Sequence, residues 1–211
     1  MLQLGQEVLP ATSVSFPPPI GGWNARDPLD GMPEVDAVRL ENFFPNTQDI
    51  MLRRGFREHA DGMGTGTIYT LAEYHKSDGT RDLIVGANSK LYEATTQGAS
   101  ATDITGTTTP TNDKWETVNF RDTLILVNGT DQPQQWNGST MSDAAYTTVP
   151  DDSVFVDVTA YKNRLYFAEI SSGSVWYGGV DAITGAVTEF DVQSLFNLGG
   201  SIQFITAWSR S

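Results

Sequence analysis

The feature that most constrains this chain is a short pattern that recurs at a fixed spacing. Each copy has an aromatic residue, then a charged turn, then an apolar run. The first leucines of the three apolar runs, Leu83, Leu124 and Leu165, are separated by 41 residues in both intervals. A repeat of this length predicts a small structural unit that is stacked several times along the chain. The copies span residues 74–85, 120–127 and 161–168.

The residues on either side extend the repeat. An alternating run precedes each aromatic residue, and a polar turn with a second aromatic or apolar mark follows each apolar run. The preceding runs are 68–74, 115–120 and 155–161, and the following marks are 90–92, 135–138 and 175–178. A fourth copy begins at 202–210, where Trp208 takes the place of Tyr161. The pattern therefore predicts three strand-rich units and the start of another.

These observations predict an all-β fold, namely an incomplete β-propeller of about 41-residue repeats. A sheet of three or four strands buries its apolar face only against the next sheet, and this period is typical of a propeller blade. A β-sandwich or barrel is the alternative, because short strands at regular spacing also describe those folds. Three copies do not close a ring, so we expect a piece of a longer polypeptide, or partner chains that cover the open edge.

The chain changes character near residue 60. Residues 1–60 contain seven of the ten prolines, and proline removes backbone donors and favours extended backbone. We predict that 1–60 is an extended N-terminal arm with one short helix at 33–42, which Pro33 opens and Pro45 closes. Residues 61–211 are predicted to be the β-repeat region, with three propeller-like blades and the start of a fourth.

Charge and composition exclude several functions. The net charge is −13, and residues 61–211 carry 18 acidic against eight basic residues. A surface this acidic argues against wrapping a DNA duplex, although DNA can slide past it without adhering. The absence of cysteine excludes disulfides, zinc–thiolate sites and thiol nucleophiles. No apolar run approaches the roughly 18 residues of a membrane span, and residues 1–16 lack the cationic start of an export signal.

The sequence shows no catalytic motif. His59 and His75 have no metal-ligand spacing, Gly-x-Ser-x-Gly is absent, and no glycine cluster is followed by Lys-Ser/Thr. Asp78-Gly79 is typical of a hairpin turn. Paired carboxylates for glycoside hydrolysis stay open, because their spacing is spatial rather than sequential. We therefore predict a protein that is not an enzyme and that has no catalytic residues, no metal site and no cofactor.

Two groups of residues are candidates for interactions. The only basic cluster lies at 53–57, and it either pairs with phosphates or acidic patches of a neighbouring subunit or is a solvated strand end. The subunit-interface candidates are Trp23, Arg26, Arg53, Arg54 and Arg57. The aromatic residues of the repeats pack between blades or form ligand platforms. These aromatic candidates are Tyr92, Trp136 and Trp176.

The N-terminal phrases GWNARDPL (22–29), MP (32–33), DAVRLENFFP (36–45) and MLRRGF (51–56) resemble the opening of tail proteins from short-tailed bacteriophages. The group is the nozzle or tail-hub group of tubular proteins. The phrases VNG (127–129) and QQWNG (134–138) are similar to a first-blade phrase of the same group. The resemblance covers residues 17–60 well and 61–211 more loosely.

The resemblance implies a structural virion component that is made in the host cytoplasm and carries a β-propeller. Its partners would be copies of itself in a ring, usually of six, together with the phage adaptor and other tail proteins. The ring's lumen would extend the DNA ejection channel below the portal, so double-stranded DNA would pass transiently without specific binding. Members of the group are much longer than this chain. The alternative function is a propeller-type recognition module that binds glycan or protein at the host surface.

Overall fold

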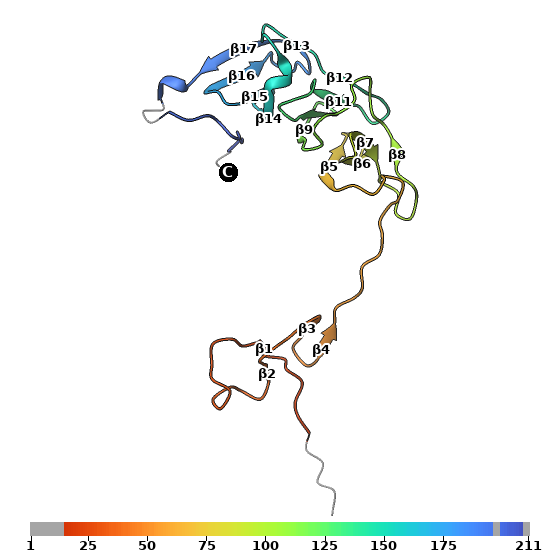
Figure 1. Cartoon of the computed structure of the whole chain (residues 1–211), viewed down its shortest axis with the longest axis vertical. Helices are drawn as coiled ribbons and strands as arrows, with labels where there is room; N and C mark the ends of the chain where they lie inside the picture. The colour runs from red at the N-terminus through yellow and green to blue at the C-terminus, as the bar shows by residue number, and fades with distance from the viewer. Residues whose placement is uncertain (1–14, 196–198, 209–211) are drawn as a thin grey trace, which may run out of the picture. The chain divides into compact units, whose positions relative to one another are not determined.

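The computed structural model describes residues 15–195 and 199–208 and divides the chain into two units. The first unit, here called the arm, ends at Arg57, and the second, here called the β-unit, begins at Glu58. The division falls three residues before the boundary expected from the sequence (Figure 1). Residues 1–14 of the predicted arm and 209–210 of the predicted fourth repeat lie outside the described residues.

The β-unit contains three antiparallel sheets that follow one another in chain order (Figure 1). Sheet 1 consists of β5 (Ile68–His75), β6 (Arg81–Ala87), β7 (Lys90–Glu93) and β8 (Thr102–Asp103). Sheet 2 consists of β9 (Glu116–Phe120), β10 (Thr123–Val127), β11 (Gln134–Trp136) and β12 (Met141–Asp143). Sheet 3 consists of β14 (Phe155–Tyr161), β15 (Arg164–Glu169), β16 (Ser174–Gly178) and β17 (Gly185–Asp191), and β13 (Tyr146–Thr147) pairs in parallel with β17.

The predicted all-β class is confirmed. The only helices among the described residues are two 3₁₀ turns, η1 (Asp152–Val154) and η2 (Gln193–Leu195), and the described strands do not close into a barrel. Each predicted run of the first three copies of the repeat coincides with one of the first three strands of a sheet. The hairpins are tight, because Lys162 and Asn163 both have positive φ, at 47° and 58°, as a two-residue type I′ turn requires. Residues 202–208 of the predicted fourth repeat form no strand.

The sheets are held together through alternating faces of their strands. We call the face of each sheet that is directed toward the preceding sheet its front face, and the opposite face its back face. In β10, Leu124 and Leu126 enter the core shared with sheet 1, whereas Ile125 and Val127 enter the core shared with sheet 3. All four side chains have no exposed surface. A run of consecutive apolar residues is expected for a strand that is covered on both faces.

The front face of sheet 1 is covered differently. Val85 and Tyr92 on this face pack against Ala60 and Met63 from the segment that precedes β5. The same segment pairs in parallel with the outer part of sheet 1 through an isolated bridge at Asp61. Residues 58–63 therefore close one end of the stack of sheets.

The arm contains two small sheets and no helix among its described residues. β1 (Gly22–Trp23) pairs in parallel with β2 (Asp36–Ala37), and β3 (Phe43–Pro45) forms a hairpin with β4 (Ile50–Leu52). The short helix predicted at 33–42 is therefore wrong. The backbone N–H of Asp36 donates to the carbonyl oxygen of Pro33 at 3.0 Å, which closes a turn, and the next residues extend along β1 instead of continuing the turn.

Candidate functional site

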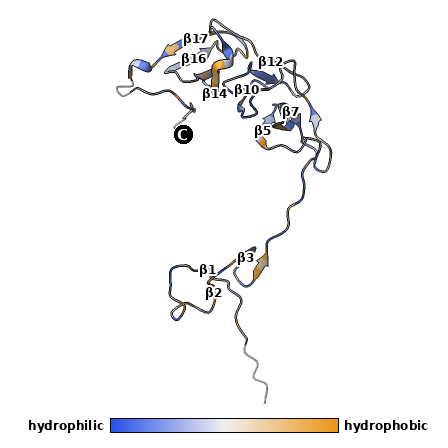
Figure 2. Ribbon diagram, in the orientation of Figure 1, coloured by the Kyte–Doolittle hydropathy of each residue, from blue (hydrophilic) through white to orange (hydrophobic). Residues whose placement is uncertain are grey.

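Residues 15–57, the described part of the arm, carry many large apolar side chains but form no core. Gly22 is the only buried residue among its described positions. Figure 2 shows β4 of the arm in the orange of hydrophobic residues, yet Leu52 in β4 is 63% exposed. Because a two-stranded hairpin alone is marginally stable in water, the arm needs another surface to bury its side chains. The exposed large apolar residues are Phe16, Trp23, Leu29, Val38, Phe43, Phe44, Met51, Leu52 and Phe56.

Two of the predicted interface residues belong to the β1–β2 part of the arm. The indole N–H of Trp23 donates to the carbonyl oxygen of Val38 at 3.1 Å, which fixes the ring while leaving it 69% exposed. Arg26 pairs with Asp27 at 2.9 Å, and this hydrogen bond lowers the pKa of the Asp27 carboxyl. The charge of Arg26 is therefore met within the arm, whereas the ring of Trp23 is available to a partner.

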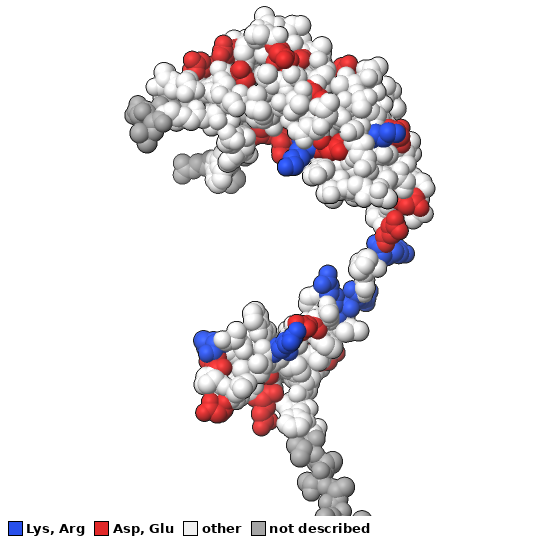
Figure 3. All heavy atoms as spheres, viewed as in Figure 1, with Lys and Arg blue, Asp and Glu red and all other residues white. Residues whose placement is uncertain are grey.

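The other three predicted interface residues form an unpaired basic segment. Arg53, Arg54 and Arg57 are exposed, and none of them forms an ion pair with another described residue. Figure 3 shows blue atoms gathered along this segment, whereas red atoms outnumber blue on the visible face of the β-unit. Three neighbouring cations without partners fit an acidic surface on another molecule better than a structural role within the arm.

The predicted repeat aromatics lie in the cores between and beside the sheets. Tyr92, Trp136 and Trp176 are only 6%, 5% and 7% exposed. The indole N–H of Trp136 donates to Asp82 Oδ2 at 2.9 Å, and that of Trp176 donates to Glu169 Oε2 at 2.7 Å. Buried rings with satisfied N–H groups are expected for packing residues. Their burial favours a packing role over a ligand platform at all three positions.

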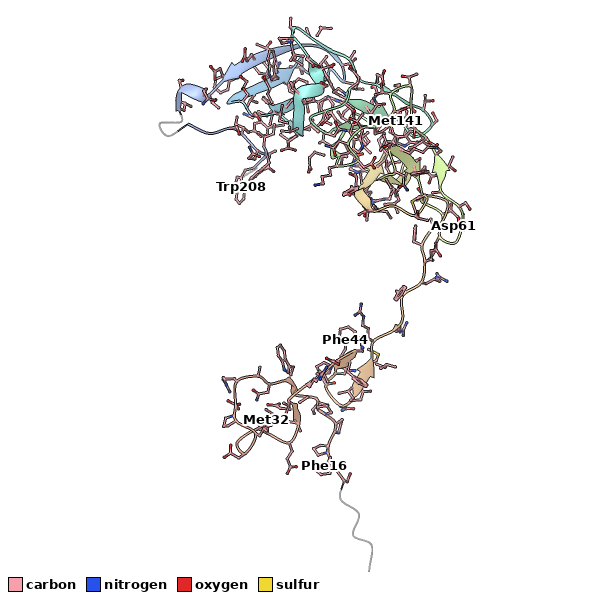
Figure 4. The ribbon with its side chains drawn as sticks, viewed as in Figure 1. Phe16, Met32, Phe44, Asp61, Met141 and Trp208 are labelled. Atoms are coloured by element: carbon pink, nitrogen blue, oxygen red, sulfur yellow. The ribbon has the colours of Figure 1, made fainter. Side chains whose placement is uncertain are left out.

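An aromatic groove runs along the back face of sheet 3, and it was not predicted from the sequence. Tyr166 lies between Tyr161 and Tyr177, with ring centroids 6.5 Å and 6.1 Å apart. Two adjoining hollows of about 300 and 190 Å³ share Tyr166 and Val175 and form this groove. Trp208, which is labelled in Figure 4, belongs to the opposite wall of the larger hollow. Its further lining residues are Thr159, Arg164, Phe190, Ile205, Thr206 and Ala207.

A row of polar positions connects successive first strands. Thr70 in β5, Glu116 in β9 and Asp157 in β14 each lie four residues before the aromatic residue of their repeat. Thr70 Oγ1 accepts the backbone N–H of Trp115 at 2.7 Å. Burial raises the pKa of the Glu116 carboxyl, and the charge of Asp157 raises it further. The first strands are therefore in contact along one side of the stack.

The described residues show no arrangement for catalysis by a metal. They contain no group of three or more His, Asp or Glu side chains that could hold an ion. His59 Nε2 lies 2.9 Å from the carbonyl oxygen of Ala94 and joins the covering segment to sheet 1, and His75 is exposed. Within the same residues, no helix has the length and apolar character needed to cross a membrane.

Comparison with known proteins adds no family to these observations. No protein-family model matches the chain, and no curated protein matches it in sequence. The repeated sheets, the arm and the groove are therefore the features of the chain that bear on its function.

Proposed function

We propose that this chain is a structural subunit of a phage tail: a ring-forming nozzle or hub protein that surrounds the DNA ejection channel below the portal and adaptor. The observation that carries the proposal is the stack of three four-stranded meanders, each packed on the next through corresponding faces. The N-terminal phrases at 22–56 direct the proposal toward tail nozzle proteins. The protein acts by its shape and its contacts, not as an enzyme.

The proposed arrangement of the sheets is an incomplete β-propeller. β9 packs against both β5 and β14, so the first strands of the three sheets lie next to one another. In a propeller, the first strand of each blade lies nearest the central channel, and the blades stack through their apolar faces. The outer strand β17 is protected by β13, which reduces the risk of edge-to-edge pairing.

The arm supplies the proposed contact between subunits. It cannot bury Phe44, Leu52 and its other exposed apolar side chains within itself, and it carries unpaired arginines at 53–57. Residues 61–211 carry a net charge of −10, because they contain eight basic and 18 acidic residues. The arm of one subunit therefore docks on the acidic β-unit of a neighbouring copy, where apolar burial and charge attraction both stabilise the contact.

The acidic β-unit also suits a channel for DNA. Phosphate contacts with clustered cations are what hold DNA to a protein, and the four lysines of the chain are separated along the β-unit. A ring lined by such a surface lets the duplex pass without adhering. In fluorescence anisotropy at about 150 mM salt, we expect the protein not to bind a labelled 30-base-pair duplex. Saturable binding at micromolar protein would contradict this part of the proposal.

The oligomeric state of the intact chain tests whether it forms a ring. We expect light scattering and electron micrographs of the intact chain to show a ring. Replacing Arg53, Arg54 and Arg57 by glutamine is expected to give monomers. The circular dichroism spectrum of this variant should be unchanged. The matched control removes the same charge from three arginines that are already paired within the chain, namely Arg39, Arg81 and Arg121. The control is expected to assemble normally. A wild-type monomer at all concentrations, with no ring in micrographs, would refute the proposal.

A further inference from the structure

The back face of sheet 3 corresponds to faces that are fully covered elsewhere in the β-unit. Ile84 in sheet 1 and Ile125 in sheet 2 occupy the same repeat position, and neither has any exposed surface, because the following sheet covers them. Tyr166 is the corresponding residue of sheet 3, and it lines the groove. The sheet 3 groove is therefore the position where a following sheet would pack.

The aromatic residue of each repeat also differs in exposure between sheet 3 and the other two sheets. Tyr74 and Phe120 are 0% and 8% exposed, whereas Tyr161 is 40% exposed. The hydroxyl group of Tyr74 also donates to the carbonyl oxygen of Asp122, in the first turn of sheet 2, at 2.9 Å. Tyr161 in the groove therefore presents a ring and a hydroxyl group at a position that contacts the next sheet elsewhere in this chain.

Residues 202–208 already lie on this face. The backbone N–H of Ile205 donates to Asp157 Oδ2 at 2.5 Å. A contact of the same kind joins sheets 1 and 2, where the N–H of Trp115, next to β9, donates to Thr70. Because Thr70 and Asp157 occupy the same repeat position, residues 202–208 lie where the first strand of a following sheet belongs.

This segment has a covered face but no strand beside it. Among residues 202–208, only the backbone N–H groups of Ile202 and Ile205 donate to described acceptors, which are Ser172 O and Asp157 Oδ2. In contrast, β9 and β14 are paired along their lengths with β10 and β15. The missing partner of 202–208 is thus an antiparallel second strand.

We propose that the groove between sheet 3 and residues 202–208 receives an antiparallel β-strand, supplied as the second strand of a further repeat unit. The occupant has a polar first residue and then a run of apolar residues on both faces, as in 83–85, 124–127 and 165–168. Its backbone pairs with 203–207, and its front-face side chains enter the groove beside Tyr166 and Val175. The inference rests on the stacked-sheet arrangement of the proposed function and not on its role in a phage tail.

The chain itself supplies a probe for this site. A synthetic peptide of residues 121–130 contains β10, whose Leu124 and Leu126 face the preceding sheet and whose Ile125 and Val127 face the following one. Amide hydrogen exchange of residues 203–207 in the intact chain is the measurement. We expect the peptide to slow the exchange of alternate amides in this segment at least tenfold, because every second N–H of a strand donates to its antiparallel partner.

Two substituted peptides test the orientation. The peptide with Leu124→Lys and Leu126→Lys places charge in the groove and is expected to give no protection. The peptide with Ile125→Lys and Val127→Lys carries the same charge on the solvent side and is expected to protect 203–207 as well as the unmodified peptide. Equal effects of the two peptides, or no protection by any peptide, would overturn the proposal.

Other occupants give distinct results. Protection that rises with protein concentration in the absence of peptide would show that a second copy fills the groove, and protection by oligosaccharides alone would show a glycan site. Either result would overturn the strand proposal. Ring assembly through the arm is measured separately by light scattering, so a failure of strand binding is distinguishable from a failure of the proposed function.

Discussion

Substitution of Trp136 distinguishes a core residue from a ligand platform. The ring is 5% exposed in the core between sheets 1 and 2, and its N–H donates to Asp82 at 2.9 Å. Trp136→Phe keeps a buried six-membered ring and removes the donor together with the small five-membered ring that carries it. A hydrogen bond to a charged group contributes about 1.5–3 kcal/mol, and Asp82 is partly exposed. We therefore expect the free energy of unfolding to fall by about 1–2 kcal/mol.

Trp136→Ala removes the buried ring as well. Truncation of a large aromatic residue in a core costs about 3–5 kcal/mol, which is a large part of the 5–15 kcal/mol that stabilises a typical domain. The variant is thus expected to lose most of its stability in urea unfolding followed by circular dichroism. Trp208→Ala is the control, because this ring is 84% exposed, and its expected cost is within about 0.5 kcal/mol.

The opposite pattern would refute this reasoning. A ligand platform can be truncated with little loss of stability, because its ring packs on the ligand instead of on the fold. If Trp136→Ala unfolded within about 1 kcal/mol of the wild type and lost binding on a glycan array, the packing role would be wrong. The difference between the Phe and Ala variants measures the contribution of the buried six-membered ring.

Three further substitutions test local features of the β-unit. Asp131 accepts four hydrogen bonds from residues 111, 112 and 128, which lower the pKa of its carboxyl although burial opposes them. Asp131→Ala is expected to cost about 2–4 kcal/mol at pH 7. The difference in the free energy of unfolding between the wild type and this variant, measured in urea, should shrink as the pH falls below about 4 and then through the pKa of Asp131 in the folded state. Gly138→Ala places a methyl group 3.1 Å from the Tyr74 ring at φ +92°, which should lower stability by about 1–3 kcal/mol in urea. Asn163→Val should lower the thermal midpoint, because φ is 58° there, whereas Asn163→Gly should not.

The repeat could be predicted because its signal is local. Each second strand is a short run of apolar residues after a charged turn, and Leu83, Leu124 and Leu165 all lie in such strands. Hairpins join residues that are close in sequence, so turn residues and apolar runs are sufficient to place them. The stacking of the sheets could also be predicted from the sequence, because a strand that is apolar at every position is buried on both faces.

The groove and the burial of the tryptophans could not be predicted, because both depend on cross-strand register. Tyr166 lies directly opposite Tyr177 in the pairing of β15 with β16, and this register is absent from the spacing of the two residues in the sequence. Similarly, Trp136 and Trp176 are packing residues only because each faces a neighbouring sheet. The helix predicted at 33–42 is wrong because Val35 and Val38 have helical spacing but have no core on which to pack.

The arm and the groove on sheet 3 are both proposed contact surfaces, and they differ in chemistry. This difference predicts how the salt concentration affects each contact. The arm combines apolar side chains with the cations at 53–57, and its proposed target is acidic, so charge contributes to that contact. The groove is aromatic, and its proposed contact depends on backbone pairing and apolar burial. The screening length falls from about 10 Å at 0.1 M salt to about 3 Å at 1 M. Raising the salt concentration should therefore dissociate the ring while 203–207 stay protected by the strand peptide. Loss of both at the same salt concentration would mean that one surface, not two, holds the assembly together.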